Sequence, residues 1–270
     1  MNAFEKLGRK NSEGRFICVG LDTDINKIPV HLKKFPEPVF EFNRQVIEKT
    51  AGDAAAYKLN FAFYENSGAE GFETLKKTID LIPDDVLIIG DAKRGDIGNT
   101  AKMYADSIFN YFRCDASTIN PYMGEDSVQP FLQFENKLNF ILALTSNPGA
   151  DNFEKLRLHN GEFLYQHVIT KVNDWNKKNN CGIVFGATRI DELKNNLGLI
   201  NKLPVLLPGV GAQGGSLEEV VKSFKEAGRL NYLINVSRGI IYRSSNKDFA
   251  SASAEELNTL NTKVKKELDM

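Results

Sequence analysis

The feature that most constrains the fold is an eightfold alternation between short apolar runs and segments with helical periodicity. Continuous apolar runs of this length are typical of parallel strands that are buried on both faces. Eight such units, with no linker-like composition between them, predict an α/β fold, a single (β/α)8 TIM barrel domain over residues 1–270. The predicted strands are 16–20, 54–59, 86–90, 116–120, 140–144, 182–186, 204–207 and 232–236.

An open, doubly wound sheet is the competing fold. It usually has fewer strands and often a glycine-rich turn after the first strand, whereas here Gly20 is followed by Leu21 and Asp22. A closed barrel turns the ends of all its strands towards one mouth, so polar residues far apart in sequence can converge there. The polar residues at predicted strand ends are Asp22, Lys58, Asp91, Lys93, Ser146 and Arg238, with a group of glycines after Leu207.

Composition limits the class of partner. The 270 residues are 42% hydrophobic and 26% charged with a net charge of -1, so no basic excess suggests nucleic acid or a membrane surface. No apolar run approaches the ~18 residues of a membrane span, and the first ten residues lack the apolar core of a secretory signal. We therefore expect a cytoplasmic protein with a small-molecule ligand.

Cysteines and histidines show no metal or disulfide pattern. Cys18, Cys114 and Cys181 are odd in number, far apart and without C-x-x-C spacing, which predicts buried thiols rather than disulfides or a zinc site. The three histidines also lack metal-ligand spacing, which favours surface or packing roles. They are His31, His159 and His167.

The segment 91–100, D-A-K-R-G-D-I-G-N-T, concentrates charge where the third predicted strand ends and its loop begins. Residues two apart in an extended chain point the same way, so Asp91 and Lys93 should share a face, with Asp96 carried further out by Gly95. A solvated turn is the alternative interpretation. The carboxyl ends of barrel strands are, however, where this fold places its chemistry.

A second segment predicts a phosphate site. Residues 208–215 read P-G-V-G-A-Q-G-G, and the S-x-x-E at 216–219 is typical of the start of a helix. Glycines let backbone N–H groups approach an anion, and barrels commonly bind phosphate after strands seven and eight. Arg238, between Ser237 and Gly239, adds a planar fork suited to a phosphate dianion. A phosphate ester is the expected substrate.

Segment 91–100 resembles the D-x-K-x-x-D-I-G-N-T signature of the orotidine 5'-phosphate decarboxylase family, bacterial-type. Segments 20–22, 57–58, 144–149 and 208–215, with the later Ser-Arg-Gly, are similar to other active-site segments of that family in the same order. The resemblance covers about residues 15–243. It implies decarboxylation of orotidine 5'-monophosphate to UMP in a homodimer with shared active sites, using no cofactor and no metal.

The resemblance also implies a role for each site residue. Lys58, Asp91 and Lys93 of one subunit and Asp96 of the partner subunit would form the catalytic row. The substrate-binding residues it implies are Asp22 and Lys58 for the ribose, Ile97 and Thr100 reaching into the neighbouring site, Ser146 for the pyrimidine, and Gln213, Gly214 and Arg238 for the phosphate.

The chemistry requires a fixed cation, because loss of CO2 from carbon 6 leaves an anion that no adjacent carbonyl delocalises. Lys93, held between two aspartates, should stay protonated, stabilise that anion and deliver a proton to it. Three alternatives remain open. They are a magnesium-dependent β-keto sugar-phosphate decarboxylase with a similar D-x-K-x-x-D element, a Schiff-base aldolase, which the flanking carboxylates oppose, and a non-catalytic nucleotide-binding barrel.

Overall fold

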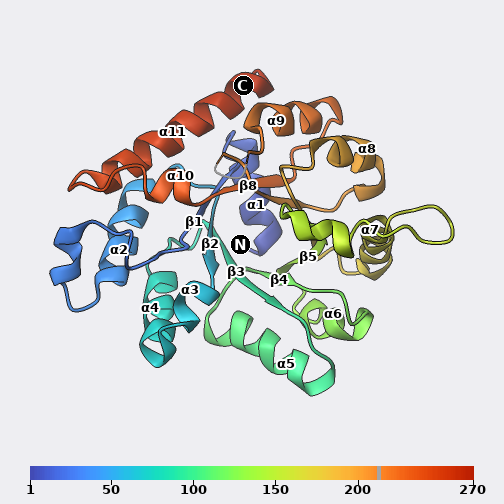
Figure 1. Cartoon of the computed structure of the whole chain (residues 1–270), viewed down its shortest axis with the longest axis horizontal. Helices are drawn as coiled ribbons and strands as arrows, with labels where there is room; N and C mark the ends of the chain where they lie inside the picture. The colour runs from blue at the N-terminus through green and yellow to red at the C-terminus, as the bar shows by residue number, and fades with distance from the viewer. Residues whose placement is uncertain (212–213) are drawn as a thin grey trace.

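The computed structural model describes residues 1–211 and 214–270, and its strands form one closed parallel barrel with helices around the outside (Figure 1). The strand order follows the chain from β1 to β8, and β8 pairs with β1 to close the sheet. The predicted barrel is confirmed. The strands are β1 (Ile17–Gly20), β2 (Ala56–Asn60), β3 (Leu87–Arg94), β4 (Ala116–Ile119), β5 (Leu138–Leu144), β6 (Cys181–Phe185), β7 (Val205–Pro208) and β8 (Tyr232–Val236).

Helices connect successive strands and cover the outer face of the sheet (Figure 1). The α-helices of the described residues are α1 (Ala3–Ser12), α2 (Pro38–Thr50), α3 (Ala62–Glu65), α4 (Gly68–Asp80), α5 (Gly98–Asp106), α6 (Glu125–Leu132), α7 (Leu164–Trp175), α8 (Ile190–Ile200), α9 (Leu217–Glu226), α10 (Arg238–Ile241) and α11 (Phe249–Leu268). Two short 3-10 helices, η1 (Val30–Lys34) and η3 (Pro148–Asn152), and a π-helical turn, η2 (Ser107–Tyr111), complete them.

The apolar side chains separate into two buried clusters because successive residues of each strand point to opposite faces. Inside the barrel, small and medium side chains such as Cys18, Ala56 and Leu206 pack together with Phe140. Outside, larger aromatic and branched side chains fill the space between sheet and helices. The packed interior leaves only the strand ends available for a binding site.

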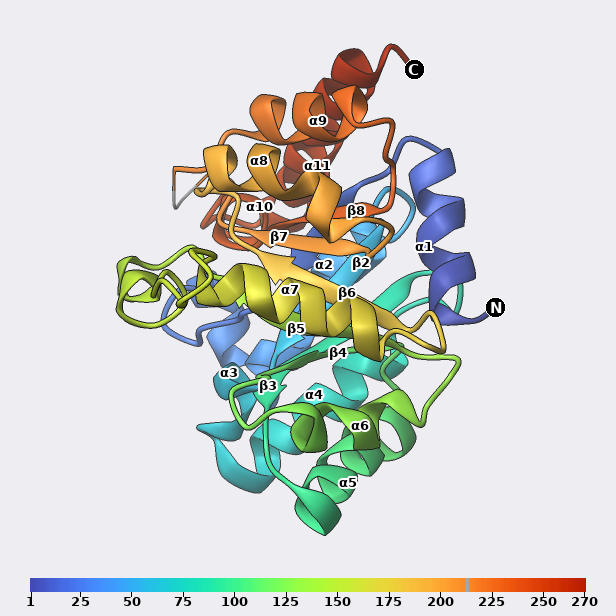
Figure 2. The same cartoon turned by 90° about the vertical axis from the view of Figure 1, so that its right-hand side faces the viewer.

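Helix α1 was not predicted, and it closes the amino end of the barrel (Figure 2). Asn2 begins the helix by accepting a hydrogen bond from the backbone N–H of Glu5, whose carboxylate in turn accepts from the N–H of Asn2. Ala3 and Leu7 insert into the inner cluster. The polar site is therefore confined to the opposite, carboxyl end.

The third strand differs from its prediction. It does not end at Gly90 but continues to Arg94, so the charges of segment 91–100 begin inside the strand. Gly90 pairs with Ser117 and Arg94 pairs with Ile119, which means that β3 advances four residues while β4 advances two. This bulge is accompanied by a left-handed backbone at Lys93, with φ of 46°. Sequence periodicity contains no signal for such an insertion.

All three cysteines are free and buried, as predicted. Among the helices of the described residues, none is long and apolar enough to cross a bilayer.

Candidate active site

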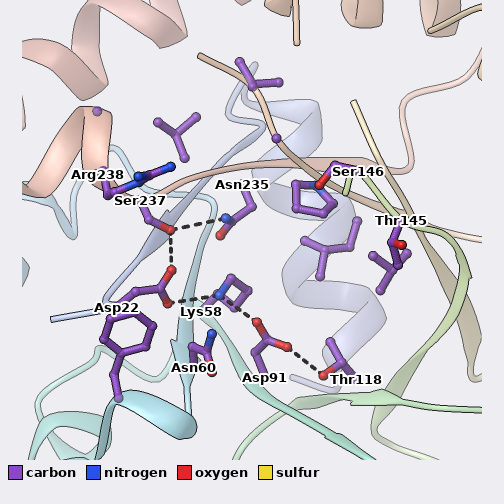
Figure 3. Close-up of a pocket in the computed structure, with 18 of the residues that line it drawn as sticks. Asp22, Lys58, Asn60, Asp91, Thr118, Thr145, Ser146, Asn235, Ser237 and Arg238 are labelled. Carbon is purple, nitrogen blue, oxygen red and sulfur yellow. Dashed lines mark hydrogen bonds and ion pairs between the residues drawn. The ribbon is translucent and has the colours of Figure 1, made fainter. Parts of the chain in front are cut away.

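A cavity of about 410 Å³ opens at the carboxyl end of the barrel. Strands from both halves of the sheet contribute to it, as predicted for the mouth of a closed barrel (Figure 3). The sequence-predicted residues that line it are Asp22, Lys58, Asp91, Lys93, Ser146 and Arg238.

A row of alternating charges crosses one wall of the cavity (Figure 3). The Nζ atom of Lys58 lies 3.1 Å from Oδ1 of Asp22 and 2.8 Å from Oδ2 of Asp91. The Nζ atom of Lys93 lies 2.7 Å from Oδ1 of Asp91. Asp91 thus holds one ammonium group on each carboxylate oxygen, an arrangement that fixes all three side chains.

The two buried members of the row keep their charges. Burial alone would lower the pKa of Lys58, but the negative charges of Asp91 and Asp22 outweigh it and raise the pKa above its usual range. Burial would raise the pKa of Asp91, but the positive charges and hydrogen bonds of Lys58 and Lys93 hold it well below its usual range. Asp91 is therefore a carboxylate, and Lys58 an ammonium, at any physiological pH.

Lys58 and Lys93 differ in access to the cavity. The side chain of Lys58 is 5% exposed and bonded on both sides, whereas that of Lys93 is 49% exposed with Asp91 as its ion-pair partner. An ammonium group that is anchored at one point and open elsewhere can meet a bound molecule with little rearrangement. Of the two lysines in the charged row, Lys93 is therefore the one that a ligand in the cavity can contact.

The wall across from the charged row is formed by the end of β5, where Ser146 lies (Figure 3). The carboxylate of Glu154 accepts from the backbone N–H of Thr145 at 2.6 Å and from its hydroxyl at 2.9 Å. Gly186 permits the close approach of β6, because a Cβ atom there would lie 2.7 Å from the nitrogen of Ser146. The backbone next to Ser146 is thus held by the bonds between Thr145 and Glu154, and it packs closely against Gly186.

Of the predicted phosphate residues, Arg238 lies on the rim of the cavity just after β8. Arg238 is exposed and lines the cavity, and no carboxylate of the described residues pairs with it. In the glycine-rich turn the N–H groups of Gly211, Gly214 and Gly215 donate to carbonyls of the turn itself. Gly214 does not line the cavity, and the predicted Gln213 lies outside the described residues.

The comparisons with known proteins agree on one family. Residues 15–253 match the model of the orotidine 5'-phosphate decarboxylase / HUMPS family. A protein of Porphyromonas gingivalis named orotidine 5'-phosphate decarboxylase is 44% identical, with 94% of this chain and 91% of the relative covered. The chain belongs to the orotidine 5'-phosphate decarboxylase / HUMPS family.

Solved structures of this decarboxylase family show the same barrel. The structure of Leishmania donovani OMP decarboxylase is 35% identical with a TM-score of 0.81, and the match covers 97% of this chain and 99% of that one. The structure of Leishmania donovani UMP synthase is 36% identical with a TM-score of 0.84, and this chain spans 57% of its length. The chain is an enzyme of the carboxy-lyase class, like its named relatives.

Three residues that the decarboxylase signature singles out lie away from this cavity. Asp96, Ile97 and Thr100 follow the end of β3, and none of them lines the cavity of its own chain. Ile97 is 56% exposed and borders a shallow groove between α5 and α6. Their place leaves them available to a neighbouring molecule.

Three polar residues of the site were not singled out by sequence reasoning. Thr118 donates to Asp91, Ser237 donates to Asp22 at 2.8 Å, and the amide of Asn235 donates to Ser237 (Figure 3). Ser237 reaches Asp22 because position 20 is glycine, where a Cβ atom would lie 1.9 Å from the hydroxyl. For Thr118 and Asn235 the available signal was a polar residue inside the apolar runs 116–120 and 232–236, and Ser237 directly follows the second run.

Proposed function

We propose that this chain decarboxylates orotidine 5'-monophosphate to UMP, the last step of de novo pyrimidine nucleotide synthesis, without a cofactor. The observation that carries the proposal is the row in which Lys93 is bonded to a buried, ionised Asp91 and opens onto the cavity. Family membership and the names of the relatives support the substrate. The proposal takes residues 1–270 as one barrel domain.

In the proposed reaction, the bond between carbon 6 and the carboxylate breaks, CO2 leaves and the electron pair stays on carbon 6. The ammonium of Lys93 lies beside that carbon, stabilises the developing charge and then transfers a proton from Nζ to it. Lys93 afterwards regains a proton from water. Because Lys93 is already in place before reaction, little reorganisation is required when the charge appears.

Asp91 contributes by its charge. Lys58 and Lys93 keep Asp91 ionised, so a substrate carboxylate placed beside it would meet a negative charge that cannot be neutralised by proton uptake. Departure of CO2 removes that repulsion, which favours the transition state over the bound substrate.

The other lining residues bind the parts of the substrate that do not react. We assign the ribose hydroxyls to Asp22 and Lys58, the pyrimidine to Ser146, and the phosphate to Arg238. Gln213 and Gly214 are proposed to complete the phosphate site. Contacts far from carbon 6 supply binding energy that is expressed at the transition state.

We further propose a homodimer with shared active sites. Asp96, Ile97 and Thr100 of each subunit would enter the partner's cavity and place a second carboxylate beside Lys93. The exposed apolar side chains around α5 and α6 support an interface on this face, since clusters of this kind commonly mark contacts between proteins. They are Ile97, Met103, Tyr111, Tyr122 and Met123.

The direct test is loss of orotate absorbance when enzyme is mixed with orotidine 5'-monophosphate. We expect full activity in EDTA and no adduct after borohydride treatment with substrate. An inactive but well-folded dimer would refute the decarboxylase assignment. Loss of activity in EDTA would favour the magnesium-dependent sugar-phosphate decarboxylase, although every carboxylate oxygen of Asp22 and Asp91 already has a protein partner.

The shared site has its own test. Lys93→Ala and Asp96→Ala proteins should each be inactive as homodimers. After subunit exchange, each mixed dimer should contain one site with both Lys93 and Asp96 intact, so activity should return. Absence of recovery, with exchange verified by mass spectrometry, would show that Asp96 acts within its own chain.

A further inference from the structure

The hydroxyl group of Thr118 bonds to both the carboxylate of Asp91 and the backbone of Lys93. Thr118 lies in β4 with 1% of its surface exposed, and its side chain lines the cavity (Figure 3). Its Oγ1 donates to Oδ1 of Asp91 at 2.8 Å and accepts the backbone N–H of Lys93 at 3.0 Å. A hydroxyl has one proton and two lone pairs, so it can do both at once.

The position of Thr118 opposite the bulge explains why both contacts occur. The ladder between β3 and β4 is regular at Gly90 and Ser117 and again at Arg94 and Ile119. Thr118 is the one residue of β4 that faces the extra length of β3. Its hydroxyl therefore takes a place that a backbone carbonyl would have in a regular ladder.

Lys93 requires this support because its backbone is left-handed, with φ of 46°. A non-glycine residue in this region is strained by about 1 kcal/mol or more and persists where its surroundings fix it. The bond from its N–H to Thr118 is such a fixing contact. The same hydroxyl also holds the carboxylate that receives the Lys93 ammonium at 2.7 Å.

We propose that Thr118 is a positioning residue that sets the placement of Lys93 relative to Asp91 by bonding to both. It supports the Lys93 backbone and orients the Asp91 carboxylate, so both ends of the Lys93–Asp91 contact are fixed from β4. The inference rests on the proposed function, because its measured effect is on the decarboxylation step.

The test uses two variants that lack the hydroxyl and one that keeps it. Thr118→Val preserves shape, Thr118→Ala removes bulk, and Thr118→Ser retains the hydroxyl. A displacement of about 1 Å of a reacting group can cost on the order of 100-fold in rate. We expect that kcat falls by about 100-fold in the valine and alanine variants, while the serine variant retains most activity.

Binding should separate from turnover. The dissociation constant for UMP, measured by calorimetry, should change little in all three variants, because the proposed phosphate and pyrimidine contacts come from β5, β7 and β8. Ser117→Ala is the matched control. Ser117 is the buried neighbour of Thr118, and its hydroxyl contacts only the carbonyl of Thr118 at 3.4 Å among its described partners. Its kcat should equal that of the wild type.

Wild-type kcat in the valine and alanine variants would overturn the inference. Parallel loss of kcat, UMP affinity and melting temperature in all three variants, serine included, would also overturn it and indicate a packing role. If one hydroxyl-free variant fails to fold, the other decides. Failure of the proposed function looks different, because the wild type itself would then leave orotidine 5'-monophosphate unchanged.

Discussion

The two ends of the barrel both contain buried lysine–aspartate pairs, yet they are built for different purposes. At the amino end, Lys6 of α1 bonds to Asp115 at 2.7 Å, and Asp115 also accepts the backbone N–H of Ile88. Both side chains are largely buried, at 9% and 12% exposed. At the carboxyl end, Lys58 and Asp91 are as deeply buried, but Lys93 opens onto a cavity.

The difference lies in what remains available after pairing. α1 covers the amino end, and its polar side chains are bonded to groups at the starts of strands, as Lys10 is to Asp85 and Asn11 is to the carbonyl of Tyr232. The carboxyl end keeps the ammonium group of Lys93 half exposed, and it has a rim arginine, Arg238, without a carboxylate partner in the described chain. Burial of charge by itself indicates structure, and incomplete satisfaction beside a cavity indicates function.

Lys93→Ala should produce the largest change. Loss of the proposed acid and of its electrostatic stabilisation should lower kcat by about 10⁴-fold or more. UMP affinity and melting temperature should change little, because the phosphate and pyrimidine contacts lie elsewhere and Lys93 is half exposed. Steady-state kinetics and calorimetry measure the two effects. Substantial residual activity would show that Lys93 is not the acid.

Lys6→Met, at the amino end of the barrel, should lower the stability of the fold and leave kcat unchanged. Removing one partner of a buried ion pair leaves Asp115 without its ammonium, which should lower the free energy of unfolding by about 3 kcal/mol. The kcat of the folded variant should match the wild type. Urea unfolding at pH 7 and kinetics below the transition provide the measurements. A decrease in kcat would mean that the two ends are coupled.

Acid should weaken the carboxyl end in a predictable direction. The ordinary pKa of Asp91 is 3.8, and its pKa in the folded protein is lower. The ionised carboxylate therefore stabilises the fold fully above pH 3.8, and this stabilisation is lost as the pH falls from 3.8 through the folded pKa. The stability difference between the wild type and Asp91→Asn should therefore shrink by about 1 kcal/mol between pH 6 and pH 3. A constant difference would show that the Asp91 charge does not stabilise the fold.

Asn2→Ala should have the smallest effect on stability, and that effect should be confined to the amino end of the barrel. It removes the side-chain cap of α1, and an exposed cap of this kind contributes roughly 0.5 kcal/mol to stability. Activity should be unchanged. Asn2→Asp is the control, since aspartate also caps helices well and should restore stability. A measurable change in kcat would contradict the separation of the two ends.

The barrel and the Asp91–Lys93 contact were predictable because they depend on patterns local in sequence, whereas Lys58 was placed in the charged row by the family resemblance. Each strand is an apolar run, and Asp91 and Lys93 are close enough in the chain for their contact to be anticipated. The bulge in β3 was not predictable, because the residues around Gly90 are typical of a regular strand. Helix α1 has a capping residue and an apolar face. It was missed because it precedes the first strand and so lies outside the alternation of strands and helices.

Contacts between strands that are far apart in the sequence also could not be predicted. Thr118 bonds to Asp91, and Ser237 bonds to Asp22, but a threonine or serine at the end of an apolar run is common in strands without any catalytic role. Only the closed sheet shows which of them face the cavity. The assignments of Asp96, Ile97, Thr100 and Gln213 rest on the family resemblance and await the tests above.

The bond between Ser237 and Asp22 joins residues 215 positions apart, just after the last strand and just after the first. During synthesis the amino-terminal strands leave the ribosome long before β8, so the proposed ribose site remains unfinished until almost the whole chain has emerged. Catalytic activity would therefore report completed translation and closure together. A truncated or stalled chain could present much of the charged row and still lack a working enzyme.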